Sequence, residues 1–201
     1  MSKLYAILLL CISPLAAYGF DGYVHGDNHC FYFNTPKGWV ADHVSGKESG
    51  VPFVFYPKNS TWSNATTVIY ARVMNKSESI KNAEDVVKDT LSLFHTKYQS
   101  PNSKAEKIET INTKLENESV IYKFTGDKFG NTEIVSYFNG ENTINYFVMT
   151  SRDKDDLNKN KKALIELSNS YKESDDCVPC SEKTHNKALN LTHGASVPCA
   201  G

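Results

Sequence analysis

The sequence predicts an α+β domain in which helices flank an antiparallel β-sheet. Three observations favour this class: runs rich in β-branched and aromatic residues, two segments with apolar residues at helical spacing, and short turn sequences between the later runs. The elements follow the order β-rich, helix, antiparallel strands, helix, which suits one sheet covered by helices rather than a parallel, doubly wound fold. With 201 residues, of which 40% are hydrophobic, the chain has the composition of one globular domain.

The β-rich runs begin soon after the N-terminus. Residues 31–33 form a short aromatic run, and the turn sequence at 34–38 ends it, because its proline fixes φ and its glycine is free to adopt unusual values. A strand is predicted to start at Trp39. Residues 51–56 and 66–74 are two further β-rich runs, and we expect them to pair in the sheet.

The first helix is predicted between residues 82 and 98. Asn82 is a suitable N-cap, and acidic residues follow it in the first turn, where the helix dipole favours them. Pro101 ends the pattern. The apolar residues that recur at helical spacing are Val87, Leu91, Phe94 and Tyr98.

Three or four strands and a second helix are predicted to complete the domain. The turns between these strands contain Asn or Gly, which tolerate positive φ and therefore favour antiparallel hairpins. The four runs are 104–113, 119–125, 133–138 and 143–150. The helix covers residues 153–171, with an acidic start. Its apolar face consists of Leu157, Leu164, Leu167 and Tyr171.

Residues 1–19 are predicted to be a signal peptide. A short basic start, an apolar run at 4–12, and the small residues Ala17 and Gly19 match the pattern, so the mature chain should begin near Phe20. The apolar run is shorter than the roughly 20 residues that span a bilayer, and no later segment comes close. We therefore expect a secreted or periplasmic protein with no membrane span after cleavage.

The charge balance argues against a nucleic-acid partner. The chain has 22 Lys and Arg residues against 23 Asp and Glu residues, a formal net charge of −1. Its arginines are Arg72 and Arg152, so few side chains can make the bidentate contacts that specific readout prefers. The expected partner is a protein or a cell surface.

Four cysteines follow the predicted leader, an even number in an oxidising compartment, and we expect two disulfides. Three connectivities are open. We favour a bridge from Cys30 to Cys177 or Cys180, with the other cysteine of that pair joined to Cys199. The bridges would fix the Cys- and His-containing tail, residues 173–201, to the domain at 20–172.

The same tail supports an alternative, a zinc-binding or thiol-redox protein. Thiolate and imidazole groups are the ligands that tetrahedral zinc prefers, although their spacing here is not that of a standard finger. The ligands would be Cys177, Cys180, His185, His193 and Cys199. A second ligand group would be His25, Asp27 and His29. We expect no cofactor, because a secretory route disfavours the free thiolates that zinc needs.

No catalytic motif has the correct spacing, so we identify no catalytic residue. Ser49, between Gly46 and Gly50, is one residue off the nucleophile elbow. Asp42, His43 and Ser45 are neighbours in sequence, but a triad requires convergence in space. Trp62 lies in a Ser- and Asn-rich loop and is the candidate for an exposed binding residue.

Several motifs resemble the PsbP-like fold family. They are Phe31-Tyr32-Phe33-Asn34-Thr35-Pro36-Lys37-Gly38-Trp39, then Phe55-Tyr56-Pro57 with Ser60-Thr61-Trp62, then Val68-Ile69-Tyr70. The likeness covers about residues 30–172 and is strongest to small secreted bacterial members. It implies an α/β/α sandwich and a domain used for binding rather than catalysis. Our first hypothesis is therefore a secreted, non-enzymatic bacterial binding protein.

Overall fold

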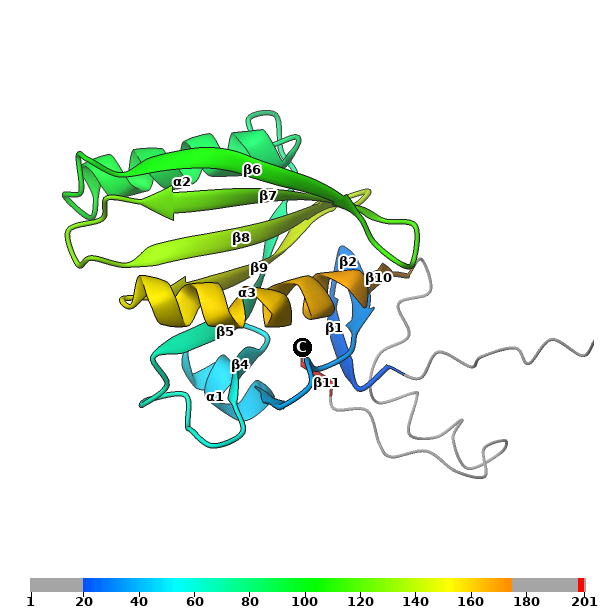
Figure 1. Cartoon of the computed structure of the whole chain (residues 1–201). Helices are drawn as coiled ribbons and strands as arrows, with labels where there is room; N and C mark the ends of the chain where they lie inside the picture. Colours follow the sequence, from blue (N-terminus) through cyan, green and yellow to red (C-terminus); the bar gives the residue numbers. More distant parts are fainter. Residues whose placement is uncertain (1–19, 175–198, 201) are drawn as a thin grey trace, which may run out of the picture.

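Two β-sheets and three helices make up the part of the chain that the structure describes (Figure 1). This structure is a computed structural model, and it describes residues 20–174 and 199–200. The predicted signal peptide lies outside these residues, and so do four of the tail residues named above. They are Cys177, Cys180, His185 and His193.

The larger sheet has seven strands in the order β3-β4-β5-β9-β8-β7-β6, and every neighbouring pair is antiparallel. This confirms the predicted α+β class and the hairpins of its second half, but the strands form two sheets where one was predicted. The strands are β3 (Trp39–Asp42), β4 (Val54–Pro57), β5 (Thr67–Asn75), β6 (Lys104–Asn112), β7 (Glu118–Thr125), β8 (Thr132–Asn139) and β9 (Thr143–Ser151).

The smaller sheet has the order β10-β2-β1-β11. Its central hairpin is antiparallel, whereas β11 lies parallel to β1. The strands are β1 (Gly22–Gly26), β2 (His29–Phe33), β10 (Lys172–Glu173) and β11 (Cys199–Ala200). The two ends of the described chain therefore meet in one sheet.

Side-chain caps begin all three helices, α1 (His43–Glu48), α2 (Ala83–Thr96) and α3 (Lys154–Asn169). The predicted cap of α2 is confirmed: the Asn82 side chain accepts a hydrogen bond from the Asp85 backbone N–H at 3.1 Å. Asp153 caps α3 in the same way. Short α1 was not predicted, because six residues are too few to show a helical period.

Helices α2 and α3 pack on opposite faces of the larger sheet, and β9 shows how one strand serves both. Phe147 and Met149 belong to the core under α3, whereas Tyr146 and Val148 belong to the cluster under α2. This alternation follows from the two-residue period of a strand. The predicted apolar face of α3 is confirmed, since its leucines are at most 2% exposed.

The smaller sheet covers one end of the core beneath α3 (Figure 1). Phe33 on its inner face contacts Phe53 and Phe55 edge-on, with ring centroids 5.0 and 5.2 Å apart. The face of β1 and β2 that points away from this core carries a second set of residues. Register places Tyr23, His25, Cys30 and Tyr32 together on it.

Candidate functional site

A cavity of about 870 Å³ lies where the β1–β2 hairpin, α1 and β5 meet. Three histidines line it: His25 and His29 come from the β1–β2 hairpin, and His43 comes from α1. We call it the histidine pocket. Its lining residues are His25, Gly26, His29, His43, Val44, Lys47, Glu48, Gly50, Val51, Pro52, Arg72 and Val73.

The hairpin turn places two of the histidines. His29 pairs with Gly26 across the hairpin, and His25 pairs with Cys30, so only Asp27 and Asn28 separate the strands. A side chain at Gly26 would collide with the His29 ring, so glycine allows the ring to lie against the β1 backbone. Both histidines are partly buried.

Helix α1 places His43 and Lys47 on the other side of the pocket. The Asp42 carboxylate starts this helix by accepting hydrogen bonds from the Ser45 backbone N–H at 2.9 Å and the Ser45 hydroxyl at 2.8 Å. A Cβ at Gly46 would lie 3.0 Å from the Phe53 Cα, so this glycine lets α1 approach the following segment closely. The local sequence therefore fixes α1 against the pocket wall.

The same hydrogen bonds decide whether Asp42, His43 and Ser45 form a helix cap or a catalytic triad. The Ser45 hydroxyl donates to Asp42 directly, and Tyr56 donates to the same carboxylate at 3.0 Å. Burial raises the pKa of Asp42, but these hydrogen bonds outweigh it and hold the pKa below its usual value. The arrangement is a helix cap, not a catalytic triad, in which a histidine would lie between the acid and the serine.

Most of the ionisable side chains that line the histidine pocket are basic. Lys47 and three histidines face one acid, Glu48, in the lining. Burial, followed by the neighbouring His25, lowers the pKa of His29, while Asp27 opposes the change. At neutral pH His29 is therefore neutral, and the pocket gains positive charge as the pH falls.

Arg72 also lines this pocket, but its charged end is directed elsewhere. The guanidinium carbon lies 5.5 Å from the centre of the Tyr70 ring, on the face of the sheet that packs under α2. There it belongs to a polar cluster with Tyr146 and Glu133. We therefore do not count its charge as part of the histidine pocket.

Glu133 is the acid of that polar cluster. Burial, with a smaller contribution from Asp127, raises the pKa of Glu133 to about 7, although Arg72 and a hydrogen bond with Thr150 oppose the shift. A pKa near neutrality can mark a functional acid. The adjoining cavity, however, has a volume of only about 10 Å³ and cannot admit a ligand.

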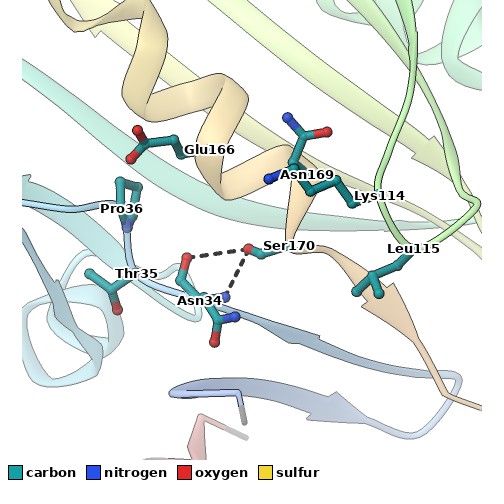
Figure 2. Close-up of a pocket in the computed structure, with 8 residues that line it drawn as sticks. All are labelled: Asn34, Thr35, Pro36, Lys114, Leu115, Glu166, Asn169 and Ser170. Carbon is teal, nitrogen blue, oxygen red and sulfur yellow. Dashed lines mark hydrogen bonds between the residues drawn. The ribbon is translucent and has the colours of Figure 1, made fainter. Parts of the chain in front are cut away.

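A second pocket, shown in Figure 2, contains the motif that carries the family resemblance. It measures about 280 Å³ and lies between the segment at Asn34, the β6–β7 turn and the end of α3. The Ser170 hydroxyl accepts a hydrogen bond from the Asn34 backbone N–H at 2.8 Å, and the Lys37 N–H donates to Glu166 at 3.2 Å. These hydrogen bonds hold the loop against the end of α3, so the role of the motif is structural.

The predicted disulfide and metal residues are only partly within the described chain. Cys30 is buried on β2, and among the described residues it has no disulfide partner. Cys199 lies on β11. The described residues hold no group of three His, Cys, Asp or Glu side chains suited to a metal, so His25, Asp27 and His29 do not form the second ligand set.

Two further observations concern the expected binding surface. Trp62 lies in the loop between β4 and β5 and is partly buried. Within residues 20–174 and 199–200, every helix is too short or too polar to span a bilayer.

The sequence pointed to His25 and His29 only as metal ligands and did not link them to His43 and Lys47. A concentration of histidines in residues 25–43 was the available signal.

Comparison with known proteins shows similarity to solved structures. The chain matches no family model and no curated protein. Among solved structures it is similar to the solution structure of cyanobacterial PsbP (CyanoP) from Synechocystis sp. PCC 6803, with a TM-score of 0.47 and 14% sequence identity. The match covers 81% of this chain and 99% of that one. That protein belongs to the family that the sequence motifs resemble, and the likeness concerns the fold alone.

Proposed function

We propose that this chain is a secreted, non-enzymatic binding protein that takes an acidic segment of a partner protein into the histidine pocket. The observation that carries the proposal is the lining of that pocket, with Lys47 and three histidines against the single acid Glu48. The proposed scaffold is a PsbP-like α/β/α sandwich with its Cys-containing tail fixed by disulfides.

The size of the pocket supports binding. Ligand sites in proteins commonly enclose about 300–1,000 Å³, and the histidine pocket falls within that range. The second pocket is smaller, and two of its lining residues, Asn34 and Ser170, are already hydrogen-bonded to each other. The histidine pocket is therefore the better candidate for a ligand.

The chemistry of the lining favours carboxylates joined to apolar groups. Lysine and protonated histidine attract a carboxylate, and neutral histidine still donates a hydrogen bond to it. Val44, beside His43, is 57% exposed and offers apolar contact at the same place. A peptide segment with acidic and apolar side chains provides both, which is why a protein partner is proposed rather than a small inorganic anion.

The test is a calorimetric titration of the full chain with a ten-residue peptide of alternating Glu and Leu. Lys47→Glu should weaken binding by about fivefold to tenfold, because reversing one close charge changes the free energy of binding by about 1 kcal/mol. Lys107→Glu is the matched control. It makes the same change in net charge on β6, at the far edge of the larger sheet, and should bind as the wild type does.

Raising the salt concentration should weaken wild-type binding, because salt screens exposed charges. Equal weakening by both substitutions would show a diffuse charge effect and would reject the pocket as the site. A wild-type chain that does not bind the peptide at pH 6 would reject the proposed function.

A further inference from the structure

Exposed apolar side chains gather at one end of the larger sheet. Leu93, Tyr98 and Phe129 are 42%, 43% and 58% exposed, and they lie in the last turns of α2 or in the loops beside it. These two loops join α2 to β6 and β7 to β8, and Figure 1 shows both at the opposite end from the smaller sheet. A group of exposed apolar residues, unlike a single one, is typical of an interaction surface.

The β7–β8 turn is held against the loop that follows α2. The Lys128 backbone N–H donates a hydrogen bond to the Ser100 hydroxyl at 3.1 Å. A Cβ at Gly126 would lie 2.3 Å from a carbonyl oxygen of that loop, so the glycine lets the two backbones approach closely. Tyr98 and Phe129 are within two residues of this hydrogen bond, so their rings belong to one surface.

Backbone hydrogen bonds define the turn that carries Phe129. The Asp127 carboxylate accepts hydrogen bonds from the backbone N–H groups of Phe129 at 3.1 Å and of Asn131 at 2.7 Å. Gly130 adopts the positive φ of 78° that the turn needs. Since the Phe129 side chain is 58% exposed and takes no part in these bonds, the fold does not require a phenylalanine at this position.

A lysine lies over each of the two exposed rings. The Lys97 ammonium is 5.6 Å from the centre of the Tyr98 ring, and the Lys128 ammonium is 5.1 Å from the centre of the Phe129 ring. A positive charge and an apolar ring are therefore presented together at two neighbouring places. We call these four residues the aromatic tip.

The two loops around the aromatic tip carry more positive than negative charge. Within residues 97–103 and 126–131 the one acid is Asp127, and the turn already engages its carboxylate. Exposed Lys104 follows the first loop and adds to the two lysines of the tip. Because the whole chain has a formal net charge of −1, this end is more positive than the molecule as a whole.

An anionic lipid surface matches the aromatic tip better than a peptide does. The cavity beside the tip has a volume of only about 10 Å³, so it cannot take up a side chain of a partner. A bilayer surface needs no pocket. Aromatic rings are favoured at its interface, and lysines are attracted to anionic headgroups there.

We propose that the aromatic tip docks this protein on the surface of an anionic membrane. Tyr98 and Phe129 enter the headgroup region, and Lys97 and Lys128 contact lipid phosphates. The contact is peripheral, because it uses loop residues. The smaller sheet, whose hairpin lines the histidine pocket, is at the other end of the molecule and stays clear of the lipid (Figure 1).

The test is co-sedimentation of the full chain with vesicles of equal parts phosphatidylglycerol and phosphatidylcholine. Phe129→Thr should weaken binding by about tenfold, because burying an aromatic ring contributes about that much to affinity. Ile108→Thr is the matched control: it removes another exposed apolar side chain, on β6, and should bind as the wild type does. Residues 1–19 are the same in every variant and cannot produce a difference between them.

The charge of the tip is tested with the same vesicles. Lys128→Glu should weaken binding by at least about tenfold, because each lysine near an anionic surface contributes about fivefold and the new acid is repelled. Lys172→Glu makes the same change in net charge on β10, in the smaller sheet, and should leave binding unchanged. Vesicles of phosphatidylcholine alone should bind the wild type more weakly than the anionic vesicles do.

A fluorescence measurement shows whether the tip itself meets the lipid. Phe129→Trp should give an emission that shifts to shorter wavelength when anionic vesicles are added, beyond any shift of the wild type. The proposal is overturned if the wild type does not bind these vesicles, if the control variants lose as much binding as the tip variants, or if the Phe129→Trp emission does not shift. These outcomes do not depend on whether the histidine pocket binds a peptide.

Discussion

Glu133→Gln is expected to stabilise the protein above neutral pH. The substitution keeps the size of the side chain and removes a carboxyl group that burial makes costly to ionise. The pKa of Glu133 rises from 4.5 to about 7 in the folded protein, so the folded state holds a proton that the unfolded state releases between these pH values. The free energy of unfolding of the wild type therefore falls as the pH rises through this window.

The size of the effect follows from that difference in pKa. Each tenfold change in proton affinity corresponds to about 1.4 kcal/mol, so the full difference corresponds to about 3 kcal/mol. Solvent reaches part of this side chain and screens it, so we expect the gain to be about 1–3 kcal/mol at pH 8. Near pH 4.5 the wild type and the variant should have similar stability.

Urea unfolding at pH 5 and pH 8 measures this directly. Comparing the two proteins at each pH cancels the contributions of all other titrating groups. Glu106→Gln, at an exposed position of β6, is the matched control and should change stability by less than about 0.5 kcal/mol at both pH values. A Glu133→Gln protein that is no more stable than the wild type at pH 8 would refute the reasoning.

Three further predictions concern a histidine, a helix cap and the leader. The pKa of His29 is lowered in the folded state, so wild-type stability should fall as the pH drops below about 6.5, and His29→Gln should reduce that fall in acid unfolding curves. Asn82→Ala should lower the free energy of unfolding by about 1 kcal/mol in urea, because it removes the hydrogen bond to the Asp85 N–H. N-terminal sequencing of the exported protein should give a first residue near Phe20, and material that retains residues 1–19 would contradict the predicted cleavage.

Long periodic segments of this sequence predicted the structure well. The run at 143–150 became β9 within one residue, and the acidic start at Asp153 became the cap of α3. The prediction is correct for these segments because their hydrophobic pattern and local capping agree with the tertiary packing. The side chains of β5 also alternate between the two faces of the sheet, as the two-residue period of a strand requires. Ile69 and Ala71 are fully buried under α3, while Tyr70 lies on the other face.

The smaller sheet and the histidine pocket could not be predicted in the same way. Strand β1 contains two glycines in five residues, so it lacks a β-rich pattern, and it is held by pairing with β2 and β11. Short α1 depends on Asp42 and Gly46, which look like loop residues in the sequence. Since the pocket exists only where these two elements meet, its residues could not be grouped without their positions in space.

The most direct test of the histidine pocket is an NMR titration of the full chain with the Glu-Leu peptide at pH 6, following the histidine ring signals and the backbone amides. The account predicts that the largest shifts occur at His25, His29 and His43 and at the Lys47 amide. Shifts centred instead on Trp62 or on the second pocket, with the three histidine rings unchanged, would contradict it.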